Sequence, residues 1–225
     1  MKHIKKGKKT MIIISCIVIT IIAVIAGRIF FLTSATTGKP IANYSIGKAA
    51  LIVIDIQEDT LSIPQYKNAD ELIQNINTSI KYADENGIDI IYIKQENSSI
   101  LDLILTGGMY KENTNGVSLS SQLLIKSDNV FSKLRNDAFS QEVFEQYLIE
   151  KQINTLYIVG ADASACVYKT SLGGVNRGYN VVILKDCIFS INDNTLSKMM
   201  KKYEEAGINV KEMNDFLQSS NNINE

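Results

Sequence analysis

The sequence predicts an α/β protein: a three-layer α/β/α, doubly wound parallel sheet of the Rossmann-like type, preceded by one N-terminal transmembrane helix. Two observations predict the sheet. Short apolar runs alternate with segments of helical periodicity from residue 49 onward, and the runs are apolar throughout, as in strands buried on both faces. A third observation predicts the membrane helix, because residues 11–32 are almost wholly apolar. We expect a single folded domain over residues 49–211.

The N-terminal apolar run predicts where in the cell the protein is located. It counts 22 residues over 11–32, and at ~1.5 Å per residue this length just crosses a hydrocarbon core of ~30 Å. We expect Arg28, near the outer end, to reach the headgroups. Five lysines precede the run and no cation follows it at once, so residues 1–10 are predicted to form a cytoplasmic basic tail of a single-pass protein of the cell membrane, with the domain outside. A cleaved signal peptide and secretion is the alternative, since small residues follow the run.

The remaining elements follow from composition and periodicity. Thr, Ser, Gly and Asn predict a linker over residues 33–48, and a polar tail is predicted over 212–225. The apolar runs predict strands over residues 49–56, 88–94, 129–133, 155–160, 180–185 and 208–211. Helices are predicted over residues 68–86, 141–152, 164–178 and 194–205.

Residues 95–128 break this alternation. They contain an apolar stretch over 100–105, then Gly107-Gly108, then helical spacing over 118–125. A connection of this length in a compact domain usually carries function or small elements of its own. We expect a lid or a subunit contact of a homo-oligomer, with disorder as the alternative.

Charge and composition exclude several classes of function. Residues 1–36 hold six cations and no acid, which leaves 17 cations against 24 acids in the remaining chain. This acidic balance argues against a nucleic-acid partner. The one histidine, His3, precedes the membrane run, so the domain has neither a Ser-His-Asp triad nor a histidine-based zinc site. Three cysteines are too few for a disulfide scaffold. We expect no metal and no cofactor.

Three reactive side chains stand at the carboxyl ends of predicted strands: Asp55, Lys133 and Cys166. Ligands of doubly wound sheets bind outside these carboxyl ends. Cys166 lies at the start of a predicted helix, where free N–H groups and the helix dipole favour a thiolate. A nearby carboxylate can take the thiol proton, an ammonium can hold both charges, and backbone N–H groups can face an oxyanion. Taken singly, each residue also has a structural explanation, as a buried cysteine, a turn aspartate or a solvated lysine.

The candidate residues lie within three longer motifs. These are LIVIDIQED (51–59), VFSKLRNDAFS (130–140) and IVGADASACVYKTSLGGVNRGYNVVILKDC (158–187). They resemble the signature blocks of the isochorismatase-like cysteine hydrolases, a superfamily that includes nicotinamidases and N-carbamoylsarcosine amidases. The resemblance implies Asp55 as general base, Lys133 as its cationic partner and Cys166 as nucleophile. It also implies a cis peptide before Asp162, with the N–H groups of Asp162 and Cys166 as the oxyanion hole.

Departures from the motifs limit what the resemblance implies. Metal-using nicotinamidases of this superfamily carry an Asp-x-His pair and a further His between the first and third blocks, whereas residues 56–132 contain no histidine. We therefore predict neither that metal site nor nicotinamidase activity. Ala163-Ser164 stands where many relatives have Thr-Asp, which affects the hydrogen bonding of the loop. Isochorismatase itself cleaves a vinyl ether without the cysteine, so Cys166 favours the acyl-transfer branch.

The leading hypothesis is a membrane-anchored cysteine hydrolase that cleaves a C–N amide-type bond of a small-molecule substrate through a thioester on Cys166. Gln57 either supports the Asp55 carboxylate or fills the loop. One alternative is a haloacid-dehalogenase-like phosphatase, since IVIDIQEDT resembles an Asp-x-Asp-x-Thr loop, although Gln57 replaces the second acid and Thr60 comes one residue late. The other is a non-catalytic tethered binding or thiol-redox domain in which Cys166 pairs with Cys187.

Overall fold

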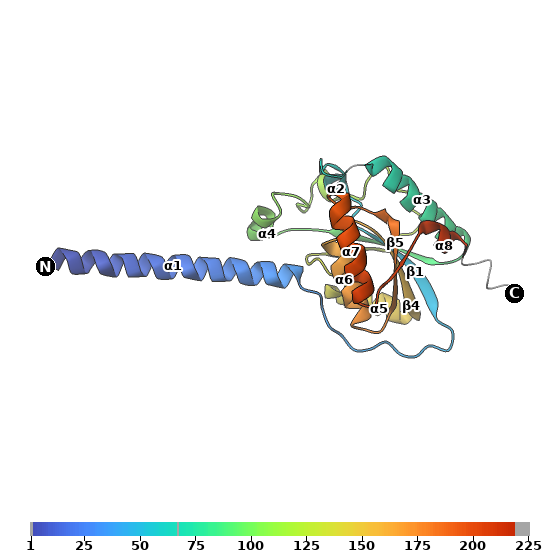
Figure 1. Cartoon of the computed structure of the whole chain (residues 1–225), viewed down its shortest axis with the longest axis horizontal. Coiled ribbons are helices and arrows are strands. Elements are labelled where there is room, and N and C mark those ends of the chain that lie inside the picture. The colour runs from blue at the N-terminus through green and yellow to red at the C-terminus, as the bar shows by residue number, and fades with distance from the viewer. Residues whose placement is uncertain (1, 67, 219–225) are drawn as a thin grey trace.

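A six-stranded parallel sheet forms the centre of the domain (Figure 1). The computed structural model describes residues 2–66 and 68–218. The strands are β1 (Lys48–Ile54), β2 (Asp89–Gln95), β3 (Val130–Lys133), β4 (Ile153–Gly160), β5 (Asn180–Ile188) and β6 (Asn209–Lys211). Their order in the sheet is β3-β2-β1-β4-β5-β6, and every neighbouring pair is parallel. The predicted doubly wound sheet is confirmed, and its strand order reverses between β1 and β4.

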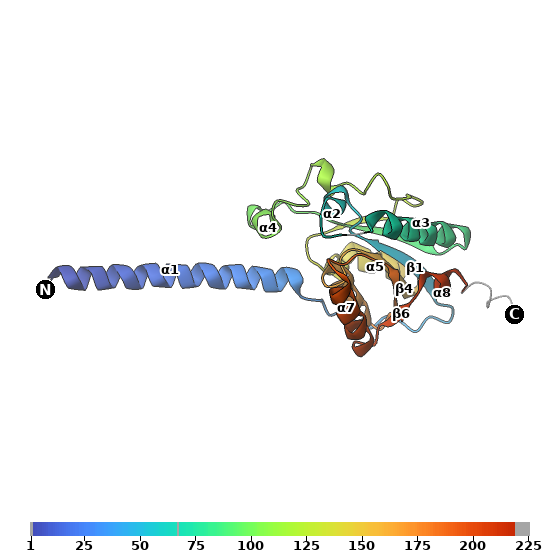
Figure 2. The ribbon, with the colours of Figure 1, turned by 45° about the horizontal axis from the view of Figure 1, so that its top comes forward.

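Helices cover both faces of this sheet, which gives the three predicted layers (Figure 2). One apolar cluster joins α3 and α8 to one face, and a second joins α5, α6 and α7 to the other. The helices and short 3₁₀ turns are α1 (Lys2–Thr33), α2 (Glu58–Leu61), α3 (Ala69–Glu85), α4 (Ile100–Leu105), η1 (Asn115–Val117), η2 (Ala138–Ser140), α5 (Glu142–Glu150), α6 (Cys166–Val175), α7 (Asp193–Glu205) and α8 (Met213–Leu217).

The end of β1 positions the first candidate residue. The strand is apolar and buried from Ala50 to Ile54, as expected of a strand covered on both faces. Asp55 then has a φ of 54°, which is outside the extended region and ends the strand two residues before the predicted limit of 56. Its N–H still donates to the carbonyl of Ile93 at 2.8 Å, so the Asp55 backbone is held against β2.

Three predicted boundaries after β4 differ from the structure. The expected helix over 164–178 begins only at Cys166, because the Asp162 carboxylate accepts hydrogen bonds from the N–H and hydroxyl of Ser164 at 2.8 and 2.6 Å and forms a turn there. The helix ends at Val175, before Gly178 with a φ of 80°, a conformation that favours glycine after a helix. β5 extends three residues beyond the predicted end at Lys185, after a register shift against β4.

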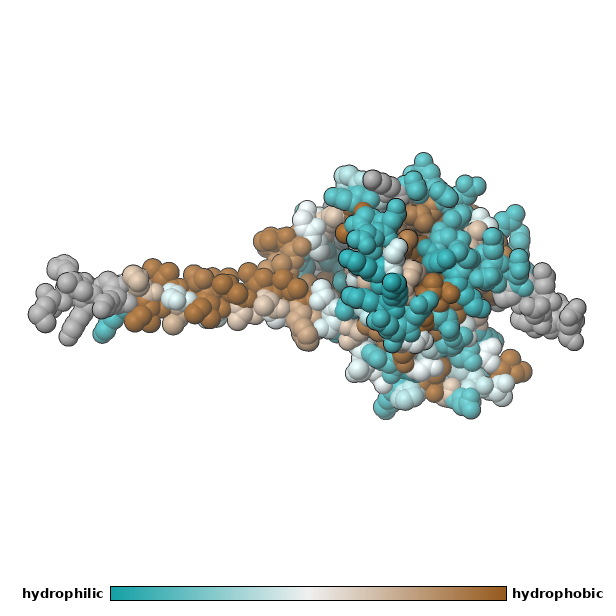
Figure 3. Space-filling view, viewed as in Figure 1, coloured by the Kyte–Doolittle hydropathy of each residue, from teal (hydrophilic) through white to brown (hydrophobic). Residues whose placement is uncertain are grey.

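The predicted membrane segment forms the long helix α1. Its apolar part, Lys9–Thr33, spans 25 residues and is long and apolar enough to cross a membrane. By this measure it is a candidate anchor or signal sequence, and Figure 3 shows its hydrophobic surface. Arg28, which we expect near the headgroups, binds the Asp102 carboxylate with N–O distances of 2.8 and 2.6 Å.

The predicted linker after α1 is bound to the domain at its beginning. Thr36 donates from both its N–H and its hydroxyl to the buried Asp137 carboxylate, each at 2.6 Å. Arg177 donates to the carbonyl of Thr37 at 3.2 Å. These contacts fix the C-terminal end of α1 relative to the sheet.

Two further segments contain structure of their own. Residues 95–128 hold α4, η1 and two isolated bridges, of which one pairs Asn97 with Lys111. The predicted polar tail begins with α8, whose Phe216 is fully buried and packs against the rings of Tyr82 and Tyr157. An aromatic side chain with a hydrophobic pocket available is buried in spite of its polar neighbours. The end of that predicted tail, residues 219–225, lies outside the described residues.

Candidate active site

Asp55, Lys133 and Cys166 meet at the carboxyl edge of the sheet. They follow β1, end β3 and begin α6, so the reversal of strand order between β1 and β4 lies among them. The Lys133 ammonium donates to Asp55 Oδ2 at 2.8 Å and to Cys166 Sγ at 3.2 Å. Lys133 is only 1% exposed and Asp55 3%. The structure thus places the three predicted residues in one cluster around a buried ammonium.

Gln95 is a fourth member of this cluster that the sequence did not single out. Its Oε1 accepts from Lys133 Nζ at 2.7 Å, while its Nε2 donates to the carbonyl of Leu134 at 2.6 Å. Lys133 therefore has three hydrogen-bond acceptors, one for each ammonium proton. The available signal was a polar side chain directly at the end of a predicted buried strand, the same signal that pointed to Asp55.

Gln57 lies in the loop after β1, and its side chain bonds to backbone groups. Its Nε2 donates to the carbonyls of Gln95 and Val117 at 2.9 and 2.8 Å, and its Oε1 accepts from the Gln95 N–H at 2.8 Å. Both amide protons are used in these contacts. Gln57 thus ties the end of β2 to η1, and among the described hydrogen bonds none joins it to the Asp55 carboxylate.

The turn between β4 and α6 contains two backbone N–H groups without an acceptor among the described residues. The Ala161–Asp162 peptide is cis, as the resemblance implies. Within the described residues, neither the N–H of Asp162 nor that of Cys166 has a hydrogen-bond acceptor in the protein. Gly160, with a φ of 121°, is packed so that a Cβ would collide with the Ile54 carbonyl oxygen. The turn therefore requires glycine at this position and leaves two N–H groups available.

The resting state of the sulfur differs from the expected thiolate. Burial raises the pKa of the Cys166 thiol, the Asp55 carboxylate raises it further, and Lys133 offsets only part of the increase. The pKa of Lys133 is also raised, because burial, which lowers it, is outweighed by Asp55 and Cys166. At neutral pH we therefore assign a neutral thiol beside an ammonium. Asp55 Oδ1 is buried and has no hydrogen-bond partner among the described residues, so it is free to accept the thiol proton.

This arrangement predicts an unusual effect of Asp55→Asn. Removing the carboxylate charge leaves Lys133 as the only charged neighbour in the cluster, so the pKa of Cys166 falls and the thiolate fraction at a given pH rises. Each pKa unit is worth up to about tenfold in thiolate. We expect alkylation of Cys166 by iodoacetamide at neutral pH to become several-fold faster, as measured by mass spectrometry of the Cys166 peptide. Asp137→Asn, which changes a buried carboxylate absent from the groups acting on Cys166, is the control. Slower alkylation in Asp55→Asn would contradict the assigned charges.

A pocket opens onto this cluster. Its volume is about 210 Å³, and its wall includes Asp55, Cys166, Tyr66, Tyr110 and Leu32. Burial raises the pKa of both tyrosines, so they remain neutral phenols. Tyr66 donates to Asp162 Oδ2 at 3.4 Å. The pocket is of a size for a small organic molecule, and Leu32, the penultimate residue of α1, belongs to its wall.

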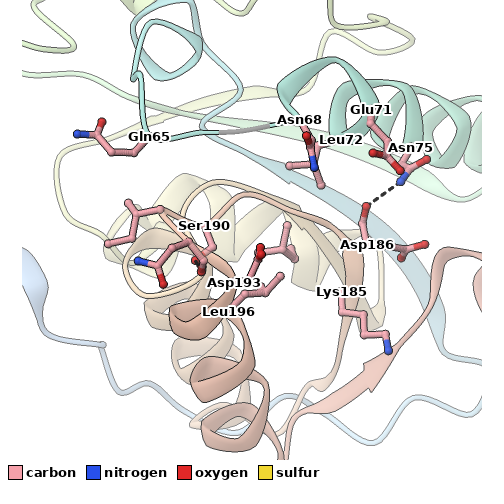
Figure 4. Close-up of a pocket in the computed structure, with 13 residues that line it drawn as sticks. Gln65, Asn68, Glu71, Leu72, Asn75, Lys185, Asp186, Ser190, Asp193 and Leu196 are labelled. Carbon is pink, nitrogen blue, oxygen red and sulfur yellow. Dashed lines mark hydrogen bonds between the residues drawn. The ribbon is translucent and has the colours of Figure 1, made fainter.

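A second cavity of about 290 Å³ lies between α3 and the start of α7 (Figure 4). Asn75 crosses part of it to donate to the carbonyl of Asp186 at 2.9 Å. Its polar lining includes no cysteine and no buried ion pair. The smaller cavity, beside Cys166, is therefore the candidate active site.

The two alternative functions lose their supporting features. Cys166 packs with the apolar cluster on one face of the sheet and Cys187 lies in the cluster on the other, and all three cysteines are free thiols. Cys187 instead contacts the hydroxyl of Ser79 at 3.6 Å. For the phosphatase reading, Thr60 would have to face a phosphate, but its hydroxyl bonds to the phenol of Tyr110 at 3.1 Å. Among the described residues, no three His, Cys, Asp or Glu side chains form a potential metal-ligand set.

Comparisons with known proteins find a matching family model, a similar sequence and similar folds. The family model for the isochorismatase domain matches residues 49–215. The isochorismatase family protein 2A of Dictyostelium discoideum is 24% identical over 170 residues, which cover 75% of this chain and 80% of that protein. An isochorismatase-like hydrolase from Alkaliphilus metalliredigens has a TM-score of 0.70 at 19% identity, covering 77% of this chain and 99% of its own.

Two further solved structures are named by activity. The nicotinamidase of Bacillus subtilis has a TM-score of 0.66 at 23% identity, covering 73% of this chain and 99% of its own. The pyrazinamidase of Pyrococcus horikoshii, solved with zinc, has a TM-score of 0.65 at 22% identity with the same two coverages, 73% and 99%. At these identities the structural likeness establishes the fold.

Proposed function

The chain belongs to the isochorismatase family, and from this premise we propose that it is a membrane-anchored cysteine hydrolase that cleaves a C–N amide-type bond of a small molecule. One observation carries the proposal: a single buried ammonium, Lys133 Nζ, contacts both a carboxylate and a thiol at the floor of a pocket. A neutral thiol beside an acceptor carboxylate is a nucleophile with its own general base, without histidine.

The first half of the proposed reaction forms a thioester. Cys166 Sγ attacks the substrate carbonyl carbon while its proton moves to Asp55 Oδ1. The carbonyl oxygen becomes an oxyanion, which accepts hydrogen bonds from the N–H groups of Asp162 and Cys166. Asp55 then gives the proton to the departing nitrogen, and the C–N bond breaks.

The second half regenerates the enzyme. Water attacks the thioester carbonyl while Asp55 takes a water proton, and the same two N–H groups hold the second oxyanion. The C–S bond breaks, and Asp55 returns the proton to Cys166 Sγ. Throughout, Lys133 keeps its contacts with Asp55, Gln95 and Cys166, so it orients the base and stabilises the sulfur when its proton has left.

The acyl intermediate provides the direct test. The full chain is incubated with a panel of small amides and ureas, acid-quenched, and digested for mass spectrometry. We expect the acyl part of a substrate on the Cys166 peptide and none on the Cys187 peptide, which is the internal control because Cys187 is fully buried. Turnover of an amide with no adduct on Cys166, even under rapid quenching, together with unchanged turnover in Cys166→Ser, would refute the thioester route.

The anchor and its orientation are a separate part of the proposal. The apolar length of α1 and the five lysines before it support an uncleaved helix with the N-terminus in the cytoplasm and the domain outside. A tag placed before Met1 should remain in the membrane fraction, while protease added to intact cells or spheroplasts should digest the domain and spare the tag. A mature protein that has lost the tag would replace the anchor with a signal peptide.

A further inference from the structure

An ion pair fastens α4 to the outer part of α1. Arg28 Nε and one terminal nitrogen bind the two oxygens of Asp102 at 2.8 and 2.6 Å. Asp102 is fully buried, and this forked geometry holds the two planar groups in one orientation. Figures 1 and 2 both show α4 displaced from the sheet toward α1, beside its last turns. The position of α4 along the axis of α1 is therefore that of residue 28.

That position corresponds to the edge of a bilayer if α1 is the proposed anchor. The apolar part of α1 has 25 residues, which at ~1.5 Å per residue is several residues longer than the ~30 Å of hydrocarbon requires. A span that enters the hydrocarbon at Met11 leaves it at about residue 30. Arg28, and with it α4, then lies at the boundary between acyl chains and headgroups of the outer leaflet.

The free face of α4 is apolar. Ile100 and Ile104, four residues apart and hence on one face, are 78% and 71% exposed. Asp102, the only acid of the helix, is turned away from solvent and neutralised by Arg28. Figure 3 shows hydrophobic residues at α4 directly beside those of α1, at the same end of the domain. An uncharged surface of this kind, continuous with a membrane span, fits acyl chains.

The same segment forms part of the catalytic pocket. Thr106 and Tyr110, which follow α4, line it, and so does Leu32 from α1. Asn97, two residues after β2, donates to the hydroxyl of Thr106 at 3.2 Å and holds the segment there. One side of the pocket is thus built from the two elements that lie at the level of the bilayer surface.

Building on the proposed anchor and cysteine chemistry, we infer that Ile100 and Ile104 insert into the outer-leaflet acyl boundary, and that the Cys166 pocket takes amphiphilic amides from that layer. The reacting amide occupies the pocket while the apolar tail of the substrate stays in the lipid. A second copy of this chain on the same two isoleucines is the competing occupant.

The chain has no tryptophan, so the fluorescence of a single introduced tryptophan reports the surroundings of that one position. Full-length Ile104→Trp is placed in phosphatidylcholine nanodiscs at one copy per disc, with acyl chains brominated or not. We expect bromine to remove about half or more of the emission, because the indole lies among acyl chains. Ile46→Trp is the matched control, because Ile46 is as exposed as Ile100, at 78%. It lies two residues before β1, at the edge of the domain that faces away from α1. Emission of Ile104→Trp that bromine does not quench, or quenches only in discs with two copies, overturns the lipid contact.

The substrate class is tested with the para-nitroanilides of acetic and dodecanoic acid, whose C–N bond breaks to give para-nitroaniline and the carboxylate. In vesicles we expect the full chain to prefer the dodecanoyl compound by about tenfold or more in kcat/KM. Ile100→Ser/Ile104→Ser should bring this ratio toward one at an unchanged rate on the acetyl compound. A ratio that survives both serine substitutions overturns the substrate class. Hydrolysis that persists in Cys166→Ala would instead refute the proposed cysteine chemistry, and the quenching result does not depend on it.

Discussion

Cys166→Ala is expected to lower kcat/KM for amide hydrolysis by roughly four orders of magnitude, because the bond that forms in the first step is made by its sulfur. Alanine leaves the Lys133–Asp55 ion pair and the backbone donors of the oxyanion hole in place, so substrate binding should change little. The prediction is checked by initial rates on any amide that the screen identifies, together with a binding measurement by isothermal titration.

Cys187→Ala is the matched control for this loss. It deletes the same atoms from a fully buried site whose sulfur contacts Ser79 and lies across the sheet from the pocket. A cost in stability of about 1–2 kcal/mol is expected from the small cavity, with turnover by the folded enzyme preserved. Equal turnover losses in the two variants would mean that Cys166 acts through packing and is not the nucleophile.

The alternation of apolar runs with helical periodicity was sufficient to predict the six strands and the helices α3, α5, α6 and α7 in their order along the chain. It also predicted the cluster in outline, because Asp55, Lys133 and Cys166 each follow a parallel strand, and parallel strands end at one edge. Boundaries were less predictable: the true start of α6 depends on the Asp162 carboxylate accepting hydrogen bonds from Ser164. Such a turn depends on one side chain and leaves no periodic signal.

The contact between α1 and α4 could not be predicted from the sequence. Arg28 and Asp102 are 74 residues apart in sequence, and each fits a local explanation, one as a residue at the membrane edge and the other as the polar residue of a short helix. Only the fold brings α4 to the end of α1. The role of Gln95 could not be predicted for a related reason. Its Oε1 is the third acceptor for the Lys133 ammonium, and this contact exists only once β2 and β3 lie side by side in the sheet.

The position of Cys166 at a helix start does not by itself decide the charge of its sulfur. A helix start favours a negative sulfur, but desolvation and the neighbouring Asp55 carboxylate both raise the pKa of the half-buried Cys166 thiol. Burial also affects Asp55, the proposed base. Its Oδ1 has no hydrogen-bond partner among the described residues, so this oxygen can accept the proton of the neutral Cys166 thiol when substrate binds. Lys133, which contacts both side chains, holds the Asp55 carboxylate and the Cys166 thiol next to each other.

Lys133→Met is therefore expected to be the most destabilising substitution in the site. Methionine approximates the length of the side chain but leaves the Asp55 charge buried without its cation. Removing one partner of a buried ion pair costs about 3–5 kcal/mol. Urea unfolding of the full chain in detergent, followed by circular dichroism, should show this loss at neutral pH, and amide hydrolysis should be lost with it. Lys185→Met is the control, since Lys185 pairs with Glu212 at the surface, where such pairs contribute about 0–1 kcal/mol.

The pH dependence and a double variant separate the ion pair from simple packing. Because the pKa of Lys133 is raised above its ordinary value of 10.5, its stabilisation is fully present below that pH and is lost only as the pH rises through the higher folded value. The stability difference between wild type and Lys133→Met should thus stay constant from neutral pH to about 10. Asp55→Asn/Lys133→Met, which buries no charge, should regain much of the lost stability but no activity. A double variant as unstable as the sum of the two single variants would mean that Lys133 stabilises the fold through its packing, and that the buried charges contribute independently of each other.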